Sequence, residues 1–247
     1  MGPGVYINLT KKHAVTLLIT LLLFEIIFAV VFLAGPVLGL PDYLIRLFDL
    51  DGEANIPAWF SSTQLFVVGA LFLLSPNWHK ASQLANPWFL LLVGLGFVFL
   101  SLDESAVIHE RVTKALKDNE WAPRFKGGHG IWISIYFSFA TLIVLVGVRT
   151  ILSFFKVYPI QSVILAAGLA CFLIGGVGME VLSYWYLRTA ENAQLYSIEV
   201  VIEEFLEMAG ISTILYGSLL CAMREPTPLS DHAMKKQYIE NTALVTK

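Results

Sequence analysis

Six long apolar segments constrain the fold of this chain more than any other feature of its sequence. Each is long enough to cross a hydrocarbon layer of about 30 Å, which takes about 20 helical residues. Every backbone polar group in a membrane must be hydrogen-bonded internally, so segments of this length are expected to be helices. The segments cover residues 14–38, 57–76, 87–110, 131–155, 160–187 and 195–222. The sequence therefore predicts an all-α fold, a bundle of six transmembrane helices.

The composition agrees with this prediction. Hydrophobic residues make up 57% of the 247 residues and charged residues only 14%, whereas a soluble domain carries about 25% charged residues. The formal net charge is −3, without a long basic run, which argues against a nucleic-acid partner and leaves the lipid bilayer as the expected one. Short loops between the segments predict one transmembrane domain over residues 1–224, followed by a polar tail over residues 225–247.

Ionisable residues enter these segments near one face of the predicted membrane. The stretch FVFLSLDESAVIHER, residues 97–111, is expected to continue the third helix, and it carries Asp103, Glu104, His109 and Glu110. Groups of this kind cost several kcal/mol at such depth unless they are paired, neutralised or bound to a cation. Because successive spans alternate in direction, the fifth and sixth spans bring more acids to the same face. These acids are Glu180, Glu199, Glu203, Glu204 and Glu207.

Helical spacing predicts how these side chains are arranged. Residues seven apart share a helix face, which places Asp103 beside Glu110 and makes Glu104 and Arg111 a candidate ion pair. On the sixth span, acids recur every four residues from position 199 to position 207, and such carboxylates repel one another unless they share protons or a cation. Glu199, the first of them, is expected at the membrane interface in contact with solvent.

The first interpretation of this layer is a site that binds one or two divalent metal ions. Carboxylate and imidazole ligands on facing helices suit iron, manganese or zinc. The candidate ligands are Asp103, Glu104, His109, Glu110, Glu180, Glu203, Glu204 and Glu207. If the site is catalytic, a metal-activated water or redox chemistry on a lipid-soluble small molecule is expected. The sequence does not establish that the protein is an enzyme.

Two other interpretations stay open. Intramembrane acids also form proton or cation pathways, and the residues for such a path are Glu25, Glu199, Glu203 and Glu207. In the third interpretation the charges are structural pairs or docking groups of a non-catalytic subunit, which would act in an oligomer or a larger membrane complex.

Three sequence segments resemble a family of uncharacterised bacterial polytopic membrane proteins. The segments are DLDGEANIPAWFSS, LSLDESAVIHER and IEEFLEMAGISTILYGSL, and the last two follow the family patterns LSxDE…HE and EExLEMxG. The family has no assigned activity, so the resemblance implies a bacterial inner-membrane location but no reaction. A small excess of lysine and arginine on the side of the two chain ends predicts that both termini are cytoplasmic and that the acidic layer lies near the non-cytoplasmic face.

Overall fold

The computed structural model describes residues 9–74, 88–119, 121–124, 130–183 and 193–223. The predicted tail, residues 225–247, lies outside these ranges, as does His129. Within them the chain is helical and has no strand. Its elements are α1 (Lys11–Ala34), α2 (Asp42–Leu47), α3 (Ile56–Leu74), α5 (Trp88–Ala106), α6 (Ile108–Leu116), α7 (Ile131–Val157), α8 (Pro159–Leu173), the π-helical turn η1 (Ile174–Met179), α9 (Glu180–Leu182) and α10 (Ala193–Met223).

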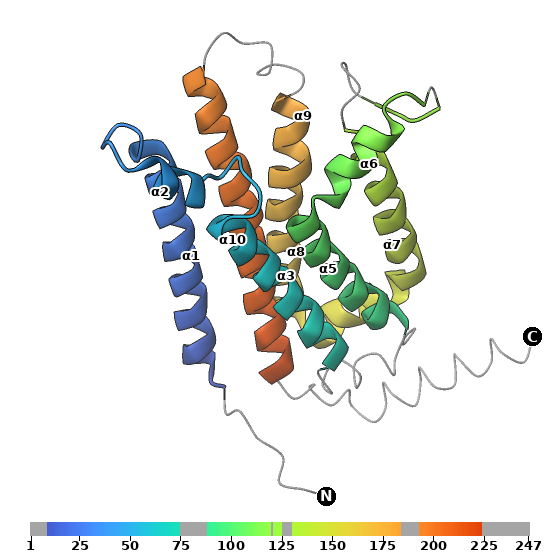
Figure 1. Cartoon of the computed structure of the whole chain (residues 1–247). Helices are drawn as coiled ribbons and strands as arrows, with labels where there is room; N and C mark the ends of the chain where they lie inside the picture. Colours follow the sequence, from blue (N-terminus) through green and yellow to red (C-terminus); the bar gives the residue numbers. More distant parts are fainter. Residues whose placement is uncertain (1–8, 75–87, 120, 125–129, 184–192, 224–247) are drawn as a thin grey trace, which may run out of the picture.

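The all-α prediction is confirmed, because six helical stretches are long and apolar enough to cross a membrane. They are α1, α3, α5, α7, the stretch Pro159–Leu182 that joins α8, η1 and α9, and Leu195–Met223 of α10. The short helices α2 and α6 are too short to be spans and lie at the upper end of the bundle in Figure 1. The length and the apolar composition of these helices thus indicate an integral membrane protein.

Helix α10 is the centre of the bundle. It is the most buried of the six spans, with 61% of its most apolar stretch inside the protein, against 44% for α3 and 11% for α1. It packs against α1, α3, α8 and η1, and in Figure 1 it lies between α1 and α8. The acids on α10 therefore face protein on several sides, whereas the outer helices expose apolar side chains as a lipid-facing surface requires.

Small residues allow the helices to approach closely. A Cβ atom added to Gly210 on α10 would lie 2.8 Å from the carbonyl oxygen of Gly168 on α8. A Cβ atom added to Gly69 on α3 would lie 2.9 Å from the carbonyl oxygen of Gly94 on α5. Backbone contacts of this kind are typical of membrane helices, which associate through packing rather than through the hydrophobic effect.

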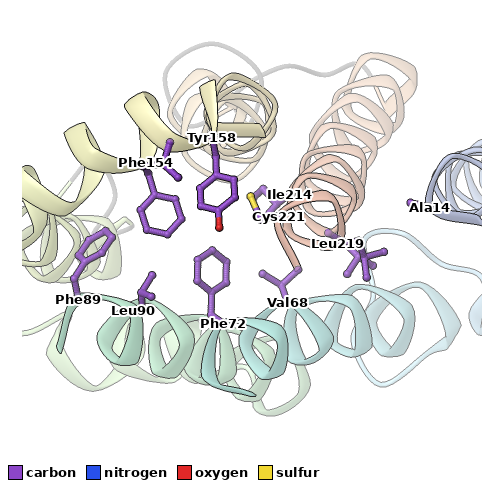
Figure 2. Close-up of a cluster of buried hydrophobic side chains, with 12 residues drawn as sticks. Ala14, Val68, Phe72, Phe89, Leu90, Phe154, Tyr158, Ile214, Leu219 and Cys221 are labelled. Carbon is purple, nitrogen blue, oxygen red and sulfur yellow. The ribbon is translucent and has the colours of Figure 1, made fainter. Parts of the chain in front are cut away.

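Aromatic side chains fill the lower end of the bundle. Phe154 and Tyr158 at the junction of α7 and α8 pack with Phe72 of α3, Phe89 of α5 and Leu219 of α10, and Figure 2 shows Tyr158 and Phe72 pointing toward each other. This cluster closes the end of the bundle at which α1 begins and α10 ends. The acidic residues of α5, α9 and α10 lie toward the other end.

Candidate functional site

The third span breaks where the acidic stretch begins to leave the bundle. Helix α5 ends at Ala106, and Val107 adopts the left-handed conformation with φ 54° and ψ 42°. Helix α6 then begins at Ile108 in a new direction, as Figure 1 shows. The prediction of one continuous helix over residues 87–110 is therefore wrong, and the side-chain alignments that depended on it change as well.

The candidate ion pair of the third span does not form. Glu104 stays on α5 and borders the cavity described below, whereas Arg111 lies beyond the break with an exposed side chain. Glu110 instead accepts a hydrogen bond from Lys114 at 2.7 Å, a pair one helical turn apart on the exposed face of α6. A pair of this kind contributes little to stability because both partners are solvated.

Asp103 bridges the break by binding the first turn of α6. Its Oδ1 accepts a hydrogen bond from the backbone N–H of His109 at 2.7 Å, and both carboxylate oxygens lie 3.3 Å from Nδ1 of the His109 ring. Asp103 is only 6% exposed. Burial is the largest single effect on the pKa of His109 and lowers it, because it favours the neutral imidazole. The hydrogen bond and the negative charge of Asp103, together with the charges of Glu104 and Glu180, act in the opposite direction. The pKa of His109 therefore lies above its ordinary value.

Trp132 of α7 fixes the other side of the imidazole. Its ring packs edge to face against His109, with 5.4 Å between the ring centroids. Its Nε1 donates a hydrogen bond to Oε1 of Glu180 on α9 at 3.2 Å. Trp132 thus connects two predicted site residues that lie far apart in the sequence.

An acidic cavity of about 340 Å³ lies between the loop before α3, helices α5 and α6, and the start of α10. His109 and the lysines Lys114 and Lys117 are the basic groups on its wall. Its acidic lining residues are Asp51, Glu53, Glu104, Glu110, Glu180, Glu199, Glu203 and Glu204. Acids outnumber bases on this wall, so the cavity attracts cations when its carboxyl groups are ionised.

The loop before α3 contributes two acids that the sequence interpretation did not include. Asn55 holds the loop in place, because its Nδ2 donates to the carbonyl oxygens of Asp49 and Gly52 at 2.6 Å and its Oδ1 accepts from the N–H of Ala58 at 3.0 Å. This loop places Glu53 at the cavity. The motif DLDGEANIP was the signal for it, since an acidic loop precedes a span there.

Charges in the cavity act on Glu53 directly. Partial burial raises the pKa of Glu53, His109 lowers it, and the charges of Glu110 and Asp103 raise it again, so that the pKa lies above its ordinary value. Next to it, Asp51 accepts a hydrogen bond from the hydroxyl of Tyr196 on α10 at 2.7 Å. The loop is therefore fastened to α10 across the cavity.

Glu199 differs most from its predicted environment. The residue is only 3% exposed, and neither carboxylate oxygen has a hydrogen-bond donor in the described part of the chain. The prediction of a solvated interfacial side chain is therefore wrong. The carboxyl of Glu203, one turn along α10, lies within hydrogen-bonding reach, but two carboxylates can bond only through a shared proton. Without a proton or a cation this part of the wall is electrostatically unfavourable.

Glu207 lies deeper on α10 and is enclosed by the π-helical turn. A Cβ atom added to Gly175 would lie 2.8 Å from its Cγ, and one added to Gly176 would lie 3.0 Å from its Oε1. The carboxyl nevertheless interacts electrostatically with those of Glu104 and Glu180. Glycine is needed at position 175 because a Cβ atom there would also lie 2.8 Å from the backbone carbonyl oxygen of Glu203, which cannot rotate away.

The structure therefore brings most of the predicted site residues to one place. The predicted residues that line the cavity are Glu104, His109, Glu110, Glu180, Glu203 and Glu204. Asp103 lies outside the lining and accepts a hydrogen bond from His109, and Glu207 lies deeper on α10. In the described ranges, no three histidine, cysteine, aspartate or glutamate side chains are already arranged as a metal-binding group. The arrangement is a wide acidic pocket rather than a compact coordination shell.

Glu25, the residue proposed for an ion pathway, is not part of this cavity. It is fully buried at 0% exposure among α1, α3 and α10, where its Oε1 accepts a hydrogen bond from Ser212 at 2.6 Å. Met208, which is 1% exposed, lies one turn before Ser212 and one turn after Glu204 on α10. An apolar side chain therefore lies between the cavity and Glu25.

Comparison with known proteins identifies a family but no activity. Neither curated proteins nor solved structures give a match. Residues 14–221, which cover all or nearly all of each of the six spans, match a family described as "Domain of unknown function (DUF8692)". The chain belongs to this DUF8692 family.

Proposed function

We propose that the acidic cavity binds a divalent metal cation, with His109, Glu104, Glu203 and Glu204 as its principal ligands. The observation that carries the proposal is the excess of carboxylates over basic groups on the wall of one cavity. Most of these acids lie on spans, where water is scarce and an unbalanced negative charge is costly. A bound divalent cation would neutralise two of these charges at once.

The environment of His109 supports a role as a ligand. Its Nδ1 lies against Asp103, and its Nε2 has no hydrogen-bond partner in the described part of the chain. Metal-binding histidines commonly donate one ring N–H to a carboxylate, which orients the ring and leaves the other nitrogen for the metal. Asp103 would then be a positioning residue, and the Trp132 ring would restrict the orientation of the imidazole.

The carboxylates provide the remaining ligands. Glu199, one turn before Glu203, is buried with no donor for either oxygen in the described part of the chain, so a cation bound by Glu203 would also offset the charge of Glu199. One imidazole with several carboxylates suits iron, manganese or zinc. The cavity of about 340 Å³ is wider than a coordination shell. The glutamate side chains must therefore move toward the ion to bind it, and their rotatable bonds permit this movement.

This site would lie at the edge of the membrane, near the non-cytoplasmic face if both termini are cytoplasmic. A lipid-soluble substrate would reach it from the bilayer. In that case the metal would supply an activated water or redox chemistry, and the chain itself would hold the ion and orient His109. A bacterial inner-membrane location is part of the same proposal.

A proton or cation pathway is the second candidate function. It is favoured by Glu25, a carboxyl buried in the middle of the bundle. Met208 lies between Glu204 and Ser212 along α10, so an ion moving from the cavity to Glu25 would have to pass this buried apolar side chain. The metal site needs only rotation of glutamate side chains, and we therefore place it first.

Metal analysis of the full chain, purified without chelator, tests the first proposal. Wild type and Asp118→Asn, an exposed acid outside the cavity lining, should retain a stoichiometric divalent metal. The double variant Glu203→Gln/Glu204→Gln should lose it. If wild type takes up no iron, manganese or zinc even after incubation with each ion, or if the double variant binds as well as wild type, the proposal is wrong.

A further inference from the structure

Three polar side chains from three different spans meet in the interior of the bundle, away from the acidic cavity. Glu25 on α1 and Ser212 on α10 are 0% exposed, and Gln64 on α3 is 4% exposed. The Ser212 hydroxyl donates to Oε1 of Glu25 at 2.6 Å and accepts a hydrogen bond from Nε2 of Gln64 at 3.0 Å. Glu25 lies roughly 20 Å along the helix axis from the start of α1, which places it well inside the span.

Two oxygen atoms of this group have no hydrogen-bond partner among the described residues. Oε2 of Glu25 and Oε1 of Gln64 are both buried, and neither receives a hydrogen bond in the described part of the chain. Both atoms are acceptors when Glu25 is ionised, so they cannot satisfy each other. An ionised carboxylate in this position would be costly, and so would each unpaired acceptor. A single proton on Glu25 removes the charge and turns one of the two acceptors into a donor.

The group is separate from the proposed metal site. Glu204, Met208 and Ser212 follow one another at intervals of four residues on α10, so Ser212 lies about 12 Å below Glu204 along the axis. Met208 between them packs in an apolar cluster with Phe28 and Val200. Glu25 therefore lies outside the coordination range of an ion in the cavity, and it is measured separately when the metal is removed.

We propose that Glu25, Gln64 and Ser212 form a proton-binding site inside the membrane, at which Glu25 reversibly takes up one proton. In the protonated state the site is neutral, and the new O–H of Glu25 is available as a donor. In the deprotonated state the carboxylate is held by the Ser212 hydroxyl, which the Gln64 amide orients. The proton comes from water and returns to water, so no other bond is made or broken.

Among the described residues, one titratable side chain responds to the charge of Glu25. The thiol of Cys171 on α8 interacts electrostatically with Glu25, and its Sγ donates to the carbonyl oxygen of Leu206 on α10 at 3.3 Å. Gln64 from α3 and Ser212 from α10 are uncharged. A change in the charge of Glu25 is therefore not compensated by a neighbouring cation in the described structure.

Infrared spectroscopy of the full chain in lipid tests the proposal. A buried carboxylic acid has a C=O stretching band that ionised carboxylates lack. We expect a band of this kind that disappears in Glu25→Gln, shifts in D2O because its proton exchanges, and is lost reversibly at alkaline pH. Asp118→Asn, which changes an exposed acid outside the cavity lining, should leave the band unchanged. The experiment is done with chelator present, so that its outcome is independent of metal binding.

Two results would overturn the proposal: no Glu25-dependent band at any pH, or a band that neither shifts in D2O nor titrates. The second result would make Glu25 a permanently protonated structural acid. If Glu25→Gln fails to fold, Ser212→Ala supplies the test, because it keeps Glu25 but removes the donor to Oε1. The band of Ser212→Ala must then change both in frequency and in the pH at which it disappears, and an unchanged band would again contradict the proposal.

Discussion

Asp103 accepts a hydrogen bond from the backbone N–H of His109 at 2.7 Å, across the left-handed residue Val107 that separates α5 from α6. This contact joins the end of a span to the start of a short surface helix. It also aligns the imidazole with the carboxylate, with Nδ1 at 3.3 Å from both oxygens. The same side chain, Asp103, therefore spans the helix break and positions the proposed ligand His109.

The Asp103–His109 contact predicts a pH-dependent contribution to stability. The pKa of His109 is raised in the folded protein, so the pair stabilises the fold fully below the unfolded value of about 6.5. This contribution is lost as the pH rises through the folded pKa. His109→Gln should therefore lower the free energy of unfolding by about 1 kcal/mol in acid, and by less at alkaline pH.

Unfolding in mixed micelles with chelator, followed across the pH range, measures this difference. Lys114→Gln serves as control, because it removes an exposed pair on the same helix. A loss for His109→Gln that is constant with pH, or larger at alkaline pH, would show that the pair does not form as described.

The left-handed backbone at Val107 predicts that glycine stabilises the junction. A β-branched residue is strained in this conformation, by roughly 1–2 kcal/mol relative to glycine. Val107→Gly should therefore raise the free energy of unfolding by about 1 kcal/mol. Val107→Ala, which loses the same methyl groups but keeps a Cβ atom, should not gain stability. Equal effects of the two substitutions would argue against a left-handed residue here.

The close contact of α8 with α10 predicts a large penalty for alanine at Gly210. Its Cβ atom would lie 2.8 Å from the carbonyl oxygen of Gly168, which is backbone and cannot rotate away. Gly210→Ala should lower the free energy of unfolding by about 1–3 kcal/mol. Gly96→Ala on α5 is the matched control, since nothing lies within 4 Å of its Cβ position, and alanine there favours the helix. Thermal unfolding of both variants measures the difference.

Hydrophobic patterning was sufficient to predict the six spans but not where they end. The third span was predicted to continue to residue 110 because DESAVIHER has no proline or glycine to mark a break. The break occurs at Val107, a residue that rarely adopts a left-handed conformation and carries no sequence signal for it. The sequence likewise does not predict the π-helical turn over Ile174–Met179.

The sequence predicted which residues form the candidate site better than it predicted the contacts between them. Glu104, Glu203 and Glu204 were expected at one depth, and they line one cavity. The pairing of Asp103 with His109 was missed because it depends on the break in the third span. The contribution of Glu53 was missed because the contacts of a loop across a bundle depend on tertiary packing rather than on helical periodicity.

The central claim is that His109 and the cavity glutamates bind a divalent cation together. Pulsed electron paramagnetic resonance of Mn2+ added to the metal-free full chain tests it most directly, because a coordinated imidazole gives nitrogen hyperfine coupling to the ion. We predict this coupling in wild type, its loss in His109→Gln, and weaker binding of Mn2+ by Glu203→Gln/Glu204→Gln. Mn2+ that binds without nitrogen coupling in wild type, or equally well in all three proteins, would contradict the account.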